Sequence, residues 1–174
     1  MIVDNIVCGK FLGLTSVAAY GAVAPLLLLI MAISQVLSTG GQMKCSEELG
    51  KGNREEANGI ASLTVLIGFA FSLIMAAVCF VFHKSIVGML GPEAGTELYR
   101  HTVEYLLGFI IGAPGFIGML ILIPFIQLDG NKKCVINATI VMTVADCAGD
   151  ICAVTVFHSG MAGIGLASSF SYYC

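Results

Sequence analysis

Long runs without charge alternate with short polar segments along this chain. Charged residues are absent from three runs, at 11–43, 57–82 and 105–128, and residues 134–174 carry only Asp146 and Asp150. Each of these runs reaches the roughly 20 residues that a helix needs to cross a bilayer. The pattern therefore predicts an all-α polytopic bundle of transmembrane helices.

The polar segments between the runs set the predicted ends of the helices. We expect helices over about 1–9 (in part), 15–44, 57–83, 98–127, 134–157 and 163–174 (in part). The chain begins and stops inside apolar sequence, so we interpret residues 1–174 as a single transmembrane domain cut from a larger protein. It would hold about five spans and the start of a sixth.

Composition excludes several classes of protein. With 57% hydrophobic and 11% charged residues, the chain lies outside the range of soluble domains. Its seven cysteines are odd in number and contain no Cys-x-x-Cys pair, so we interpret them as packing residues. No basic patch suggests nucleic acid as a partner, and the partner that the composition predicts is the lipid bilayer.

Basic residues indicate how the chain is oriented in the membrane. Five of the eight fall on one predicted side, at Lys44, Lys51, Arg54, Lys132 and Lys133, and three on the other, at Lys10, Lys84 and Arg100. Because loops rich in Lys and Arg stay in the cytoplasm, the connectors near residues 45–56 and 128–133 are predicted to be cytoplasmic.

Glycine and proline are frequent inside the fourth span, which holds Gly108, Gly112 and Pro114 among others. Glycine lets neighbouring helices approach closely, and proline removes a backbone hydrogen bond. The pattern is typical of a tightly packed bundle that can bend, and one hypothesis is a hinge at Pro114. The alternative is that membrane helices simply carry more of both residues than soluble ones.

Asp146 and Asp150 are the most informative polar residues. An ionised Asp near the middle of the bilayer costs about 2.5–3.5 kcal/mol, so such residues usually face a cavity or a partner. Residues four apart share a helical face, and Gly149 leaves room beside the second acid. Two carboxylates this close favour holding a proton or a small cation.

A competing interpretation is that the fifth span is broken, with Asp146 as an N-cap and Asp150 in the first turn. A third acid in a different apolar run, Asp4, argues against it. Three acids that converge would instead line a cavity inside the bundle.

Several short motifs resemble the multidrug and toxic compound extrusion (MATE) transporters. "VDNIVCGKFLG" followed by "VAAYGAVAPLLLLI" is similar to the family's first helix, turn and second helix, and "LGKGNREEAN" to its first cytoplasmic connector. "QLDGNKK" resembles the connector after the fourth helix, and "GMAGIGLASSFS" resembles the entry to the sixth. The motifs follow the family's order and spacing over essentially the whole chain.

The resemblance implies most of the N-terminal lobe of a two-lobe, twelve-helix antiporter, with the second lobe missing. Such a protein would sit in the plasma membrane as a multi-pass protein and export organic, often cationic, compounds by multidrug efflux. Inward flow of protons or sodium would drive the export, with no cofactor besides this coupling ion.

The resemblance also implies an ion site. Asp4 and Asp150 fall at the family's acids on the first and fifth helices, and Ser168 falls where many members have Thr. Asp146 stands where many have Asn, which adds a titratable group. Oxygen ligands suit a proton or a hard cation, so sodium could bind at Asp4, Asp146 and Asp150.

Other polar residues and other functions receive weaker predictions. Gln35, Ser38 and Thr39 could line a substrate path, although Ser and Thr often bond their own helix. We expect no enzyme: "CAGD" only approaches the Gly-x-Gly-Asp motif of intramembrane aspartyl proteases, with Cys147 in place of the first Gly. A non-transporting structural bundle and a lipid flippase of the same superfamily stay open as alternatives.

Overall fold

The protein is described by a computed structural model that covers residues 8–155 and 160–173. A short π-helical segment, η1 (Cys8–Leu12), precedes α2 (Leu14–Gly50), α3 (Arg54–Met89), α4 (Glu97–Leu128), α5 (Lys132–Thr155) and α6 (Gly160–Ser171). Over these described ranges the regular structure is helical, and α2 to α5 are each long and apolar enough to cross a membrane. The predicted all-α membrane bundle is confirmed.

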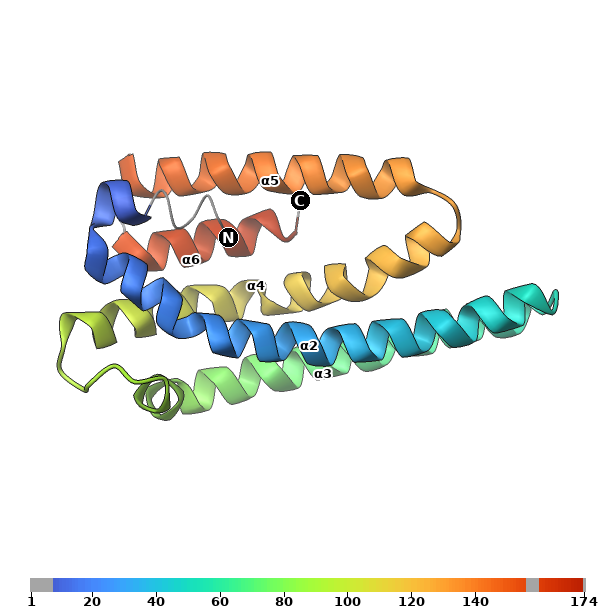
Figure 1. The fold of residues 1–174 in the computed structure, drawn as a ribbon, viewed down its shortest axis with the longest axis horizontal. Helices are drawn as coiled ribbons and strands as arrows, with labels where there is room; N and C mark the ends of the chain where they lie inside the picture. Colours follow the sequence, from blue (N-terminus) through green and yellow to red (C-terminus); the bar gives the residue numbers. More distant parts are fainter. Residues whose placement is uncertain (1–7, 156–159, 174) are drawn as a thin grey trace.

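The helices form an antiparallel, up-and-down arrangement (Figure 1). α2 and α3 pair along their length, α4 packs against both, and α6 lies between α4 and α5. The α2–α3 turn and the α4–α5 connector lie at the same end of the bundle, and the α3–α4 segment lies at the other. The two connectors that carry most of the basic residues therefore share one side.

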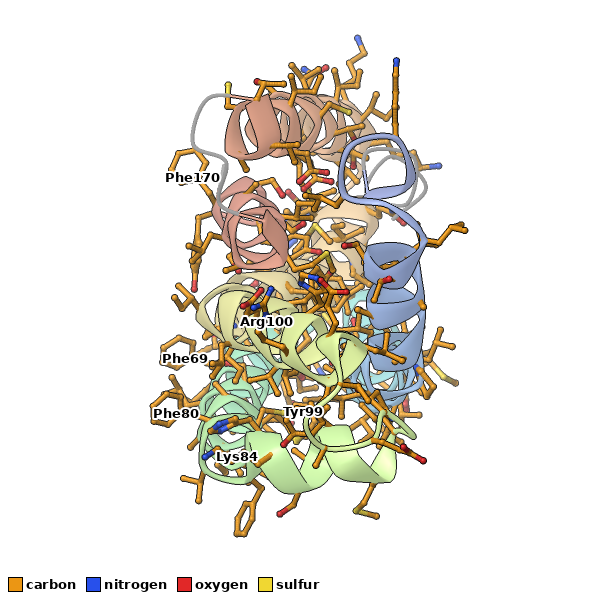
Figure 2. The ribbon with its side chains drawn as sticks, turned by 90° about the vertical axis from the view of Figure 1, so that its left-hand side faces the viewer. Phe69, Phe80, Lys84, Tyr99, Arg100 and Phe170 are labelled. Atoms are coloured by element: carbon orange, nitrogen blue, oxygen red, sulfur yellow. The ribbon has the colours of Figure 1, made fainter. Side chains whose placement is uncertain are left out.

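The outer flank of the bundle is apolar. Figure 2 shows Phe69 and Phe80 of α3 and Phe170 of α6 projecting from the same side, and all three are more than half exposed. Apolar side chains of this size on a helix surface are suited to contact with lipid tails. The chain is thus a multi-pass membrane protein surrounded by a bilayer.

Two helices extend beyond the ends that the sequence pattern predicts. α2 continues six residues past 44, to Gly50, because Glu and Leu favour a helix and no strong helix breaker occurs earlier in "CSEELG". α3 likewise continues past 83 to Met89. Glycines with positive φ follow both ends, Gly52 at 82° and Gly91 at 108°, in a conformation that glycine adopts readily.

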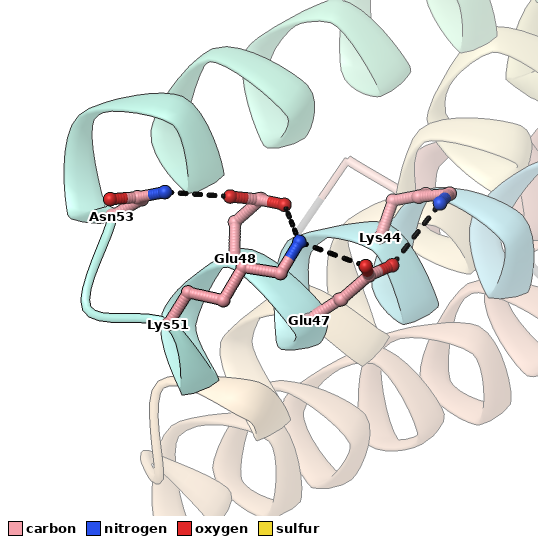
Figure 3. Close-up of polar contacts among 5 residues, drawn as sticks. All are labelled: Lys44, Glu47, Glu48, Lys51 and Asn53. Atoms are coloured by element: carbon pink, nitrogen blue, oxygen red, sulfur yellow. Dashed lines mark hydrogen bonds and ion pairs between the residues drawn. The ribbon is translucent and has the colours of Figure 1, made fainter.

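Charged side chains tie the α2–α3 turn together (Figure 3). Lys51 Nζ donates to Glu48 Oε1 at 2.7 Å and to Glu47 Oε1 at 2.9 Å, while Lys44 Nζ lies 3.1 Å from the other oxygen of Glu47. Asn53 donates to Glu48 at 3.0 Å. The hydrogen bonds to Glu48 and Glu47 raise the pKa of Lys51 above its ordinary value.

Polar side chains of α2 reach the backbone of α4. Ser38 Oγ donates to the Ile121 carbonyl at 3.3 Å, and Gln42 Nε2 donates to the Pro124 carbonyl at 3.0 Å. Tyr20 also packs edge-on against Tyr105, with ring centroids 5.2 Å apart. Hydrogen bonds between helices are favourable in a membrane, where water is absent.

α4 is a continuous helix through both Pro114 and Pro124. In the view of Figure 1 its second half bends away from α3 and toward α5. Proline in a helix interior is a common cause of bending, because its ring clashes with the preceding turn. A hinge motion at Pro114 stays a prediction.

Candidate functional site

α5 runs without interruption through both of its aspartates, so the interpretation of a broken fifth span is wrong. Asp146 and Asp150 are therefore one turn apart on one face of a helix. This face lies against α6, because a Cβ added to Gly149 would come within 3.1 Å of Ala167 Cβ. The absence of a side chain at Gly149 allows the acid-bearing part of α5 to approach α6.

The two acids differ in burial and in their contacts. Asp150 is fully buried, with no exposed surface, whereas Asp146 is half-buried. Ser171 Oγ on α6 donates to Asp146 Oδ1 at 3.1 Å. A hydrogen bond to an ionised carboxylate is stronger than one between neutral groups.

Ser168 lies one helical turn before Ser171 on α6 and is also fully buried. Within the described part of the chain, its Oγ has no hydrogen-bond partner. Buried hydroxyls usually have a hydrogen-bond partner, so Ser168 offers a polar atom to a ligand inside the bundle. Asp150 and Ser168 are thus both buried on two helices that pack together, with Asp146 half-buried at the same interface.

Asp4, the remaining predicted ion ligand, lies outside the described residues. Convergence of all three acids therefore stays a prediction. Among the described residues no group of three His, Cys, Asp or Glu side chains forms a metal cluster. What the described interface supplies is two carboxylates and two hydroxyls, a set of oxygen atoms suited to a proton or to an alkali cation.

A pocket of about 350 Å³ adjoins this interface between α4, α5 and the end of α6. Its mostly apolar lining includes Met119 and Leu122 of α4, Met142 of α5 and Tyr172 just after α6, and Ser171 lines it as well. Ser171 therefore contacts both the pocket and Asp146.

Sequence reasoning identified neither the pocket nor Ser171. The spacing of Ser168 and Ser171, three apart on α6, was an available signal for the serine, because residues at that spacing share a helical face. The pocket depends on how α4, α5 and α6 pack, which no local pattern revealed.

The residues predicted to line a substrate path lie on α2. Ser38 is buried and bonded to α4, whereas Gln35 and Thr39 are exposed on the surface of the helix. Their contribution to a substrate path stays a prediction.

Comparison with known proteins identifies the family. A family model described as MatE matches residues 1–151. No curated protein matches the sequence significantly.

Solved structures share the fold. The Vibrio cholerae MATE transporter VcmN in its bent form is 22% identical, with a TM-score of 0.88, and the alignment covers 99% of this chain and 39% of that one. A MATE protein in complex with MaD3S is 17% identical, with a TM-score of 0.89 and coverage of 99% and 38%. A Pyrococcus furiosus transporter of the MOP superfamily is 18% identical, with a TM-score of 0.89 and coverage of 99% and 37%.

The present chain thus spans less than two fifths of the length of these solved proteins. All three are described as MATE or MOP-superfamily proteins, and two of them explicitly as transporters. The family's transporters are not enzymes, which confirms the prediction that this chain is not one and removes the protease alternative. Since the family model covers most of the sequence, the chain belongs to the MatE family.

Proposed function

We propose that this chain forms the ion-coupling lobe of a secondary-active exporter of organic, often cationic, compounds. The observation that carries the proposal is the buried interface in which Asp150, fully buried on α5, lies on the same helical face as Asp146 and packs against the part of α6 that holds Ser168. Acids inside a membrane bundle usually serve an ion pathway, because their burial is costly.

The coupling ion acts by neutralising Asp146 and Asp150. With both carboxylates ionised, closing the interface around them would be unfavourable, because two like charges would be placed in a dry site. Binding a proton or a sodium ion removes part of this cost. Ion binding therefore shifts the equilibrium between open and closed forms of the lobe, as alternating access requires.

The apolar pocket beside the pair supports an organic substrate. Its volume of about 350 Å³ falls at the lower end of the range for small-molecule sites, and its methionine and tyrosine lining suits an apolar or aromatic group. A positive charge on that substrate would be attracted by the neighbouring acids. Competition between substrate and coupling ion for these acids would produce antiport.

The preference for cationic substrates is a separate step of this proposal. The Pyrococcus furiosus structure is described as having a binding pocket of reverse polarity that suggests a different function, so one fold serves more than one substrate. Preference for cations here rests on Asp146 and Asp150. A second lobe would complete the exporter, which we place in the plasma membrane with the α2–α3 turn in the cytoplasm.

Ion binding by the chain itself is the first test. The purified chain in lipid nanodiscs is titrated with ²²Na⁺ at several pH values, as wild type and as Asp150→Asn. We expect Asp150→Asn to weaken sodium binding by at least about tenfold, since it removes a buried charge. Asp129→Asn makes the same chemical change at an exposed position in the α4–α5 connector and should bind as wild type does.

The same titration also shows whether the site binds protons as well as sodium. If the site takes protons, raising the sodium concentration will release protons into a weakly buffered solution from wild type and not from Asp150→Asn. Wild-type protein that binds neither ion would overturn the proposal. Equal binding by Asp150→Asn and wild type would favour a structural bundle in which the acids have no role in coupling.

Transport is tested in proteoliposomes loaded with a fluorescent organic cation. We expect an imposed inward sodium or proton gradient to drive export when the second lobe is supplied, and Asp150→Asn to abolish the dependence on the gradient. Export by Asp150→Asn at the wild-type rate, and with the same response to the gradient, would contradict the assignment.

A further inference from the structure

The hydroxyl of Ser171 has two acceptors and one hydrogen. Its Oγ lies 2.7 Å from the carbonyl oxygen of Ser168 and 3.1 Å from Asp146 Oδ1. A serine hydroxyl can donate one hydrogen bond at a time, although it can accept two. Ser171 is only 1% exposed, so bulk water does not compete for either bond.

The choice between these acceptors depends on the state of Asp146. An ionised carboxylate attracts the hydroxyl hydrogen more strongly than a neutral carbonyl does, because the hydrogen bond is charge-assisted. A cation bound at Asp146 offsets part of that negative charge, so the serine hydrogen is then held less strongly by Asp146 and turns to the Ser168 carbonyl. The Ser171 hydroxyl thus has one arrangement when no cation is bound at Asp146 and another when one is.

Ser171 also touches the apolar pocket, where the next residue, Tyr172, is part of the lining. Tyr172 packs within an aromatic group, with its ring centroid 5.0 Å from that of Phe116 and 6.3 Å, edge-on, from that of Phe109. A change in the Ser171 hydrogen bond therefore occurs next to a side chain that shapes the pocket.

Neighbouring serines do not share this position. Ser169 Oγ donates to the Gly108 carbonyl of α4 at 2.7 Å, on the side of α6 that faces away from Asp146. Among the described side chains, Ser171 is the one whose hydrogen bond to Asp146 and contact with the pocket are both defined.

We propose that Ser171 is a positioning residue that orients Asp146. Through this contact it links binding of the coupling ion at Asp146 and Asp150 to binding of the organic cation in the adjacent pocket. The inference rests on the proposed function, since it assigns the means by which ion and organic cation influence each other. Coupling of this kind is reciprocal: if the ion weakens substrate binding, the substrate weakens ion binding by the same factor.

The test measures that factor directly. Rhodamine 6G, an apolar organic cation, is titrated into the full chain in nanodiscs with and without saturating sodium, and ²²Na⁺ binding is measured with and without the dye. Three variants are compared with wild type: Ser171→Ala, Ser171→Thr and Ser169→Ala. Thermal unfolding of each variant shows whether it is folded.

The quantity compared is the ratio of the dye affinities measured with and without saturating sodium. In wild type we expect this ratio to differ from one several-fold. Ser171→Ala should bring this ratio close to one and weaken sodium binding about tenfold, in keeping with loss of a hydrogen bond to a charged group. Ser171→Thr retains the hydroxyl and should restore the ratio. Ser169→Ala, a matched change on the other face of α6, should keep the wild-type ratio even if it lowers stability.

Each result is decisive. A folded Ser171→Ala protein with the wild-type ratio overturns the inference and leaves the ion-coupling function intact. Equal loss of the ratio in Ser169→Ala and Ser171→Ala also overturns it, because general loosening of α6 would then be the cause. Wild-type chain that binds no ion overturns both the proposed function and this inference.

Discussion

α6 presents two different surfaces to its two neighbours. Toward α4 it brings Gly165 and Ser169 against Gly108 and Gly112, so that backbones touch: a Cβ on Gly108 would lie 2.9 Å from the Gly165 backbone. Toward α5 it presents Ser171, whose hydroxyl donates to Asp146. One helix thus has a tightly closed face and a polar face.

Hydrogen bonding separates the two faces as well. On the α4 side, Ser169 donates to the Gly108 carbonyl at 2.7 Å and Tyr173 donates to the Ile111 carbonyl at 2.9 Å, so both hydroxyls have fixed acceptors. On the α5 side, Ser171 has two acceptors for one hydrogen. We infer that the α4 face provides stability, which allows the α5 face to change its state.

The largest expected effect on stability comes from adding a methyl group where α6 packs closely against α4. In Gly112→Ala the new Cβ would lie 2.5 Å from both Cα and Oγ of Ser169, and the backbone of a packed helix cannot move away cheaply. We expect a loss of about 1–3 kcal/mol in the free energy of unfolding, typical of overpacking. Reversible unfolding in mixed detergent micelles provides the measurement.

Gly118→Ala is the matched control on the same helix. A Cβ at Gly118 would meet nothing within 4 Å, and alanine favours a helix over glycine by about 1 kcal/mol. This variant should be as stable as wild type or more so. If both glycine variants lose the same stability, close backbone contact is not what distinguishes the α4 face.

A smaller effect is expected on the α5 face from Asp146→Asn. The amide oxygen can still accept from Ser171, and the charge removed is that of the half-buried acid, whereas Asp150 is fully buried. Sodium binding, measured with ²²Na⁺, should therefore weaken by less than in Asp150→Asn, and the free energy of unfolding should change less than in Gly112→Ala. If Asp146→Asn abolishes sodium binding and Asp150→Asn does not, the more exposed acid is the principal ligand.

These two faces also show how far the sequence alone predicts this molecule. Charge-free runs predicted the helices because burial in a membrane excludes charge over about 20 residues. The i, i+4 spacing likewise predicted that Asp146 and Asp150 share a face. Helix ends were predicted less well, since the charged "SEELG" is as compatible with a helix as with a connector.

Contacts between helices were beyond local patterns. The glycines of α4 indicated close packing, but nothing in the sequence identified α6 as the partner or Gly165 as the residue opposite Gly108. The same limit applies to Ser171, whose role depends on the rotation of α6 relative to α5. Rotation about a helix axis is set by packing against its neighbours, which a single sequence does not reveal.

Variants that remove hydrogen bonds between α2 and α4 test whether the tight packing between α4 and α6 extends to α2. Ser38→Ala removes the donor to the Ile121 carbonyl and should cost about 0.6 kcal/mol, the average for such bonds in a membrane protein. Thr39→Ala alters the next residue, which is exposed, and should leave stability unchanged. A larger loss in Thr39→Ala would point to a contact on the outer face of α2, where a substrate path is predicted.

The smallest effect is expected at the α2–α3 turn, far from both faces of α6. Lys51→Met removes the cation that joins Glu47 and Glu48, but these pairs are exposed and screened by water and salt. The unfolding temperature should therefore fall by less than in Ser38→Ala. Faster amide exchange confined to residues 47–53 should be the visible change.

The pH dependence of this turn follows from the raised pKa of Lys51. A raised pKa in the folded state means that the contribution is complete below the ordinary value of 10.5 and is lost only as pH rises through the folded value. Exchange at the turn, corrected for its intrinsic pH dependence, should be constant between about pH 6 and 9. Protection that falls within this range would show that a group other than Lys51 controls the turn, and that its ion pairs add little to the fold.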